Sequence, residues 1–402
     1  MVPDLRKRYN AAFSRKNYEA FLNDLNKSKI FSLALPISET PLFLTDDLTE
    51  KLINASNKIT AQMQTDEFKK YSEPAVPEMF FVPNEDEHPL FFLLDFAVCR
   101  NEKGFIPMLI EMQGFPSHFF FMSLLEEKYR DYFPVPENLT TYFSGLNRSS
   151  YRDLMKNILL DGSDPENTIL LEVEPEKQKS RAEFGCTLES TGITPVNLSS
   201  IIKRKNKLYY KKNGKEIPVH KIYNRVIQDE VVRKNVQFDF KFTDELDVKW
   251  IGHPNWFFKI SKYSLPFLKS EFVPPAFFLN NNFRIPDDLE NYVLKPLFSY
   301  SGQGVEIDVS KEMIERIENK SDYILQKKIE YSPLVLTPDG FLKAEIRMIY
   351  VWPFKEKKRG EISQPILVNN LVRMGKGKMM GIDYNRNQTW AGMTTAYHAL
   401  TF

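Results

Sequence analysis

The chain has 402 residues, with 54 basic and 53 acidic side chains and a formal net charge of +1. This near balance argues against nucleic acid or an anionic membrane as the main partner. Two cysteines cannot build a disulfide framework, and the N-terminal residues lack the apolar core of a signal peptide, so we expect a reducing, cytoplasmic location. The length suits two or three domains.

Residues 1–85 are expected to be mainly helical. Tyr18, Phe21, Leu22 and Leu25 recur at the spacing of one helix face. Thr45 is followed by two acidic residues, and we expect it to cap a second helix because its hydroxyl can accept a hydrogen bond from the first turn.

A hairpin of two strands is expected next, in the segment 86–145. Apolar runs at 89–100 and 105–113 flank a turn at 101–104, and two such runs joined by a short turn form an antiparallel pair. A helix is expected at 119–129.

Three polar residues interrupt the apolar runs of this hairpin: Asp95, Glu111 and Gln113. Antiparallel pairing lets Asp95 face Glu111, and Gln113 lies on the same face as Glu111 because side chains alternate along a strand. Side-by-side carboxylates repel unless a cation lies between them, and Mg²⁺ prefers oxygen ligands. The hypothesis is a magnesium site; the alternative is a solvent-facing strand edge.

The segment 146–285 reads as an α/β unit. A buried strand at 168–173, a helix and a second strand at 193–196 predict a parallel sheet. Asn213-Gly214 is a hairpin turn sequence. A helix is expected at 255–269.

The segment 286–402 opens with a glycine-containing loop. A strand at 292–294 leads into Lys295, and the alternating pattern at 305–309 predicts a return strand. Glycine lets backbone N–H groups approach an anion, and the lysine adds a positive charge. An ordinary turn is the alternative reading of these loop residues: Ser299, Ser301, Gly302, Gln303 and Gly304.

A strand at 323–329 has the length to pass behind a nucleotide base and to offer it a backbone donor and acceptor. Gln326, Lys327 and Lys328 would then lie at the sugar end. The alternative is an edge strand with solvated lysines.

Two arginines lie on the strands that follow. Glu345 and Arg347 share one face of a strand, and Arg347 could reach a phosphate with its planar fork or could simply form an ion pair. The same two readings apply to Arg373.

These motifs, taken in order, resemble the circularly permuted ATP-grasp proteins, a group related to the glutathionylspermidine synthases. The stretch Tyr292-Val-Leu-Lys-Pro296, the glycine loop and the strand from Tyr323 resemble the ATP-grasp nucleotide lobe. In this chain the stretch that resembles the acidic metal strands, with Asp95 and Ile110-Glu-Met-Gln113, lies far upstream, as in the permuted group. Two departures are Gln113 in place of asparagine and Gln326-Lys327 in place of an acid.

The resemblance implies a mixed fold, α+β with α/β parts, in which a nucleotide cleft lies between two α+β lobes beside a Rossmann-like domain. The implied division has four parts: a helical region at 1–85, metal-binding strands at 86–145, a Rossmann-like substrate domain at 146–285, and the ATP-binding lobe with the remaining core strands at 286–402.

The resemblance also implies an ATP- and Mg²⁺-dependent ligase that activates a carboxylate as an acyl phosphate for attack by an amine or similar nucleophile. Arg347 and Arg225 would be catalytic, and Asp95, Glu111 and Gln113 would hold Mg²⁺. The ATP-binding residues would be Lys262, Lys295, Ser299, Ser301, Gly302, Gln303, Gly304, Gln326, Lys327 and Lys328.

Ser117 and His118 follow the metal strand and are expected either to open a helix N-terminus toward an anionic substrate or to be structural. The substrates would be small-molecule or peptide carboxylates and amines, which the sequence does not identify. Three alternatives stay open: a nucleotide-binding or scaffolding module without turnover, a kinase of the same fold, and a purely structural protein.

Overall fold

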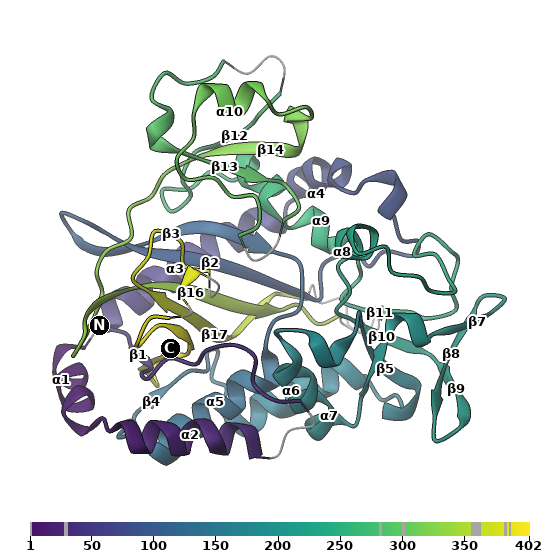
Figure 1. Ribbon diagram of the computed structural model, residues 1–402, viewed down its shortest axis with the longest axis horizontal. Coiled ribbons are helices and arrows are strands. Elements are labelled where there is room, and N and C mark those ends of the chain that lie inside the picture. The colour runs from purple at the N-terminus through teal and green to yellow at the C-terminus, as the bar shows by residue number, and fades with distance from the viewer. Residues whose placement is uncertain are drawn as a thin grey trace.

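The computed structural model describes residues 2–27, 31–280, 284–299, 302–354, 363–381, 384–385 and 387–402. A central antiparallel sheet has a small lobe above it, a parallel sheet to one side and helices below it (Figure 1). Each of these units has an apolar core: a large one around the central sheet and its helices, a second on the parallel sheet and a third in the small lobe.

The central sheet has six strands in the order β18, β17, β16, β2 and β3, with β15 paired to β16. The predicted hairpin is confirmed as β2 and β3, and Asp95 lies opposite Glu111 in its register. The bounds of the strands are β2 Phe91–Asn101, β3 Gly104–Gln113, β15 Val335–Thr337, β16 Gly340–Val351, β17 Ile366–Gly375 and β18 Gly392–Thr394.

A β-bulge interrupts the pairing of β2 with β3. Asp95 pairs with Glu111 while Phe96 pairs with Leu109, so Ile110 has no partner on β2. The extra residue reverses the side-chain alternation. Leu109 and Met112 are therefore both buried although they are three residues apart, and Glu111 lies on the opposite face from Leu109.

Helices cover the central sheet. The Thr45 hydroxyl accepts a hydrogen bond from Leu48 N, as predicted, and the helix that it caps, α3, packs against β3. Below the sheet, α2 packs on α5, which in turn contacts α6 and α7 (Figure 1). Within the described ranges, no helix is long and apolar enough to cross a membrane. The helices are α1 Pro3–Ala12, α2 Arg15–Lys27, α3 Asp46–Met63, α4 Asp66–Ser72, α5 Phe119–Tyr132, α6 Arg148–Leu160 and α7 Arg181–Thr191.

The predicted parallel sheet is confirmed, with the strand order β11, β10, β5 and β6 and parallel pairing throughout. The Asn213-Gly214 turn joins β8 to β9 in a three-stranded meander with β7. These strands are β5 Thr168–Glu172, β6 Thr194–Asn197, β7 Ile202–Arg204, β8 Lys207–Lys212, β9 Lys215–Val219, β10 Lys221–Asn224 and β11 Lys249–Ile251, and a small sheet joins β1 Leu42–Phe43, β4 Leu139–Thr140 and β19 Ala396–Ala399.

The helix predicted at 255–269 is wrong as a single element. It divides into α9, Trp256–Lys259, and a 3-10 helix, η6, Lys262–Phe267. Ser261 between them is extended, and its hydroxyl caps η6 by accepting from Tyr263 N. The chain therefore turns just before Lys262.

The small lobe contains β12 (Ala276–Phe278), β14 (Tyr323–Lys327), β13 (Tyr292–Pro296) and α10 (Lys311–Glu315). The return strand predicted at 305–309 is wrong: a single bridge joins Glu306 to Leu294, and β13 pairs with β14 instead. The chain bends after this bridge toward α10, which Ser310 caps, so too few residues remain for a strand.

Gly114, directly after β3, fits tightly against α9. A Cβ at this position would lie 2.1 Å from the carbonyl oxygen of Trp256. We expect Gly114→Ala to lower the free energy of unfolding by about 1–3 kcal/mol, because the backbone would have to move apart.

The measurement is chemical denaturation with circular dichroism. Gly377→Ala is the matched control, since a Cβ there meets its nearest atoms at an ordinary 3.5 Å. Equal stability of the two variants would contradict this packing.

Candidate active site

A cleft of about 600 Å³ opens where the central sheet, the parallel sheet and the glycine loop meet. Ligands of parallel α/β sheets bind at the carboxyl ends of the strands, and the cleft includes Glu172 at the end of β5 and Arg225 just after β10. Its lining is cationic, which favours an anionic ligand. Three acidic residues, Glu111, Glu172 and Glu230, are outnumbered by seven basic ones: Lys177, Lys179, Arg225, Lys234, Lys262, Arg347 and Arg373.

Lys262, the first residue of η6, joins three parts of the cleft. Its Nζ donates to Glu111 Oε1 at 2.5 Å and to the Ser299 carbonyl at 2.7 Å. Burial alone would raise the pKa of Glu111, but Lys262 and Arg373 together favour the charged form, so the pKa lies below its usual value. The predicted nucleotide and metal residues therefore meet, although they lie far apart in the sequence.

Lys295, on β13, contacts the same hairpin strand, β3. Its Nζ donates to the Ile110 carbonyl at 2.9 Å and to Gln326 Oε1 at 2.6 Å. The bulge at Ile110 presents this carbonyl. Burial lowers the pKa of Lys295 to about 8.

A buried ion network crosses the floor of the cleft. Asp95 accepts hydrogen bonds from Arg347 Nε and Nη2, each at 2.7 Å, and from Arg373 Nη2 at 2.7 Å. Arg373 also contacts Glu345, which accepts from the Tyr331 hydroxyl at 3.0 Å. Burial opposes ionisation of Asp95, yet the two arginines hold its pKa below the usual value. For Glu345, burial prevails and raises the pKa.

Arg225, just after β10, also lines the cleft. Its Nη1 donates to the Pro116 and Ser117 carbonyls at 2.6 and 3.0 Å, and its guanidinium lies 5.2 Å from the Phe115 ring centroid. The Ser117 hydroxyl and both ring nitrogens of His118 are buried without a hydrogen-bond partner among the described residues. Burial and the nearby arginines lower the pKa of His118 to about 3, so its ring is neutral.

The N-terminus of α5 does not open toward a ligand. The Glu183 carboxylate from α7 accepts from Phe120 N and Phe121 N, at 3.2 and 2.8 Å. These N–H groups are the ones that a ligand would need, so the expected anion site at this helix end already holds an internal carboxylate.

The other predicted nucleotide residues are spread more widely. Gln303 lines the cleft and accepts from Arg233 Nη1 at 2.8 Å, and Gly302 and Gly304 have positive φ values of 74° and 68°. Ser301 lies outside the described residues, so its predicted role is untested.

The backbone donors at the end of β14 and directly after it, where the nucleotide base was expected, are already used. Lys327 N donates to the Pro275 carbonyl at 2.8 Å and Lys328 N to the Asn291 carbonyl at 2.7 Å. A base would need other donors, or a shift of this strand.

The predicted metal residues differ in access. Glu111 and Gln113 line the cleft, whereas Asp95 is fully buried with both oxygens bound to arginines. In the described part of the chain, no group of three or more His, Cys, Asp or Glu residues could hold a metal ion. Glu111 and Gln113 offer oxygens that fit a Mg²⁺ carried by a phosphate ligand; Asp95 does not fit such a role.

Sequence reasoning left out several residues of the site. Glu172 and Glu230 line the cleft, and burial raises the pKa of Glu172 to about 8. Glu183 lies inside a helix and Tyr331 outside any strand, so no local pattern indicated either residue. Arg373 was named from the sequence, and the structure places it directly opposite Glu345 in the register.

No protein-family model matches the chain, and no curated protein matches it. Among solved structures it is similar to a glutathione synthetase-like effector, GSS30, from Globodera pallida, in the apo form. The TM-score is 0.54 and the identity 10%, over 93% of this chain and 95% of that chain. The two chains therefore share a mixed α+β fold over nearly their whole length, and at this identity the likeness shows the fold alone.

Glu183 gives the site a pH-dependent stability. Burial raises the pKa of its carboxyl from 4.5 to about 7. Between these values the folded state holds a proton that the unfolded state has released, so stability falls as the pH rises through this window. We expect Glu183→Gln to gain up to about 3 kcal/mol relative to the wild type between pH 4.5 and 7.

Denaturation at several pH values measures this difference. Glu189→Gln, at an exposed position of the same helix, is the matched control. A constant difference between the Glu183 variant and the wild type would show that Glu183 is ionised throughout this range.

Proposed function

We propose that the protein is an ATP-grasp-type ligase that joins a carboxylate to an amine or a similar nucleophile. The contact of Lys262 with both Glu111 and Ser299 supports this most directly. It brings the glycine loop of one lobe against the acidic hairpin of the other, across a cationic cleft. The shared fold with a glutathione synthetase-like protein agrees with this class.

The reaction would proceed in two steps. A substrate carboxylate oxygen attacks the γ-phosphorus of ATP, and the bond to the β-phosphate oxygen breaks, which gives ADP and an acyl phosphate. The amine then attacks the carbonyl carbon, phosphate leaves, and the amine loses a proton to water.

The chain's own residues would bind and orient these groups. Lys262 and Lys295 would exchange their present carbonyl acceptors for phosphate oxygens, and the glycine loop would cover the phosphates. Mg²⁺ held by Glu111 and Gln113 would neutralise phosphate charge. Arg347 would stabilise the transferring phosphoryl group and Arg225 would orient the substrate.

A nucleotide-binding module without turnover is the second candidate. The ion pairs already formed by Asp95 and Glu111 favour it, because a metal ion that supports turnover would have to compete with the basic side chains for these carboxylates. In either case we place the protein in a reducing, cytoplasmic compartment, since Cys99 and Cys186 are buried and form no disulfide within the described residues.

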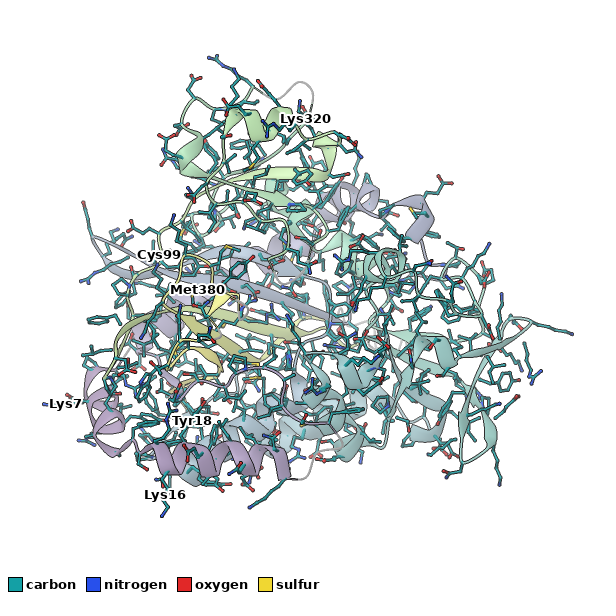
Figure 2. All side chains as sticks on the ribbon, in the orientation of Figure 1. Lys7, Lys16, Tyr18, Cys99, Lys320 and Met380 are labelled. Atoms are coloured by element: carbon teal, nitrogen blue, oxygen red, sulfur yellow. The ribbon has the colours of Figure 1, made fainter. Side chains whose placement is uncertain are left out.

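We expect Lys262→Ala to weaken ATP binding by about 10- to 100-fold, the usual worth of a charge-assisted hydrogen bond. Isothermal titration calorimetry with MgATP measures this. Lys16→Ala is the control, because Lys16 projects outward from α2, far from the small lobe (Figure 2). Equal affinity of both variants would contradict the assignment of Lys262.

Turnover is tested by ATP hydrolysis and product mass with a panel of carboxylates and amines. An amide product that is lost in Glu111→Ala supports the ligase. A phosphorylated product alone indicates a kinase. Binding of ATP without hydrolysis across the panel indicates the module without turnover.

A further inference from the structure

Two guanidinium groups form part of the cleft floor. Arg347 lies on β16 and Arg373 on the neighbouring strand β17, and both line the cleft. Asp95 lies on β2, on the other side of β16, directly opposite Arg347 in the register, and it accepts three hydrogen bonds of 2.7 Å from the two arginines.

Asp95 is committed to these arginines. Its side chain is 1% exposed and does not line the cleft, and its two oxygens accept all three of these bonds. Coordination of a metal ion by Asp95 would take the counter-charge from Arg347 and leave Arg373 with Glu345 alone, which is costly in a protein interior.

Only some of the N–H donors of Arg347 and Arg373 are bonded to carboxylates. A guanidinium has five N–H donors. Arg347 spends Nε and Nη2 on Asp95, and Arg373 directs Nη2 at both Asp95 and Glu345. Within the described ranges, no carboxylate accepts a hydrogen bond from Nη1 of Arg347 or from Nε and Nη1 of Arg373. Their side chains remain 12% and 20% exposed, toward the cleft that they line.

We propose that Arg347 and Arg373 form a paired oxyanion site, and that Asp95 and Glu345 are positioning residues that orient this pair. Two forks fixed by carboxylates suit an anion with several oxygens, because the donors are oriented before the ligand arrives. The identity of the anion rests on the proposed function: it is the phosphoryl group in transfer. The orienting role of Asp95 does not rest on it.

The test is calorimetry with inorganic tripolyphosphate in the presence of EDTA, so that no divalent cation takes part. We expect Arg347→Met, Arg373→Gln and Asp95→Asn each to weaken binding at least about tenfold. The Asp95 variant is the decisive one. It adds positive charge to the region, so a merely electrostatic role predicts tighter binding and a positioning role predicts weaker binding.

Two controls accompany these variants. Arg204→Gln removes an arginine from an exposed pair with Glu216 and should leave binding unchanged. Glu345→Gln should weaken binding in the same direction as Asp95→Asn, and it keeps the proposal testable if Asp95→Asn fails to fold.

Electron paramagnetic resonance of Mn²⁺ with ADP gives the second readout. We expect Asp95→Asn to leave the bound Mn²⁺ signal unchanged. Loss of that signal with intact tripolyphosphate binding would make Asp95 a metal ligand and overturn the proposal. Tighter binding of glutarate than of tripolyphosphate would overturn the assignment to a phosphoryl group.

These outcomes are separate from the proposed function. Oxyanion binding that depends on the pair, in a protein without ligase activity, would support this inference and contradict the proposed reaction. Ligase activity with unaltered anion binding in all three variants would support the proposed reaction and contradict this inference.

Discussion

A carboxylate without solvent must have its charge balanced by the protein, and in this chain that requirement connects three neighbouring strands. Asp95 is fully buried on β2, and its counter-charges come from Arg347 on β16 and Arg373 on β17. A shift of any of these strands would separate the charges. The register of the central sheet is therefore fixed by charge pairing as well as by its apolar core. The arginines that line the cleft are held in place by the same pairing.

The basic residues on the walls of the cleft are held by more varied contacts than those on its floor. Lys262 donates to a carboxylate and a carbonyl oxygen, and Lys295 donates to a backbone carbonyl and an amide oxygen, so both ammonium groups have acceptors without a ligand. A polyphosphate would replace bonds of similar kind, and its net gain would come from additional charge and from the exchange of several contacts at once. This arrangement is consistent with a site whose lobes are already close together before a ligand binds.

The sequence predicted strand pairing between neighbouring segments well, and contacts between segments far apart in the chain less well. The β2–β3 hairpin and its Asp95–Glu111 pairing followed from two apolar runs and a turn, and the α/β order indicated the parallel sheet. The partner of β13 did not follow, because β14 lies beyond α10 and an alternating pattern was nearer. The break in the helix before Lys262 was not predicted, because Ser261 acts as a cap only through its extended backbone conformation, which the sequence does not show. The contact of Asp95 with Arg347 and Arg373 was not predicted either, because the sequence allowed each arginine to pair with an acidic residue closer in the chain.

The bulge at Ile110 has an evolutionary consequence. Strict alternation from Leu109 would send Glu111 and Gln113 into the core, and one inserted residue turns both toward the cleft. The polar character of this wall thus depends on the number of residues in the strand. Changes in the Ile110 side chain would leave it intact, whereas deletion of one residue would exchange its two faces. Relatives of this protein should therefore tolerate substitution here more readily than a change of length.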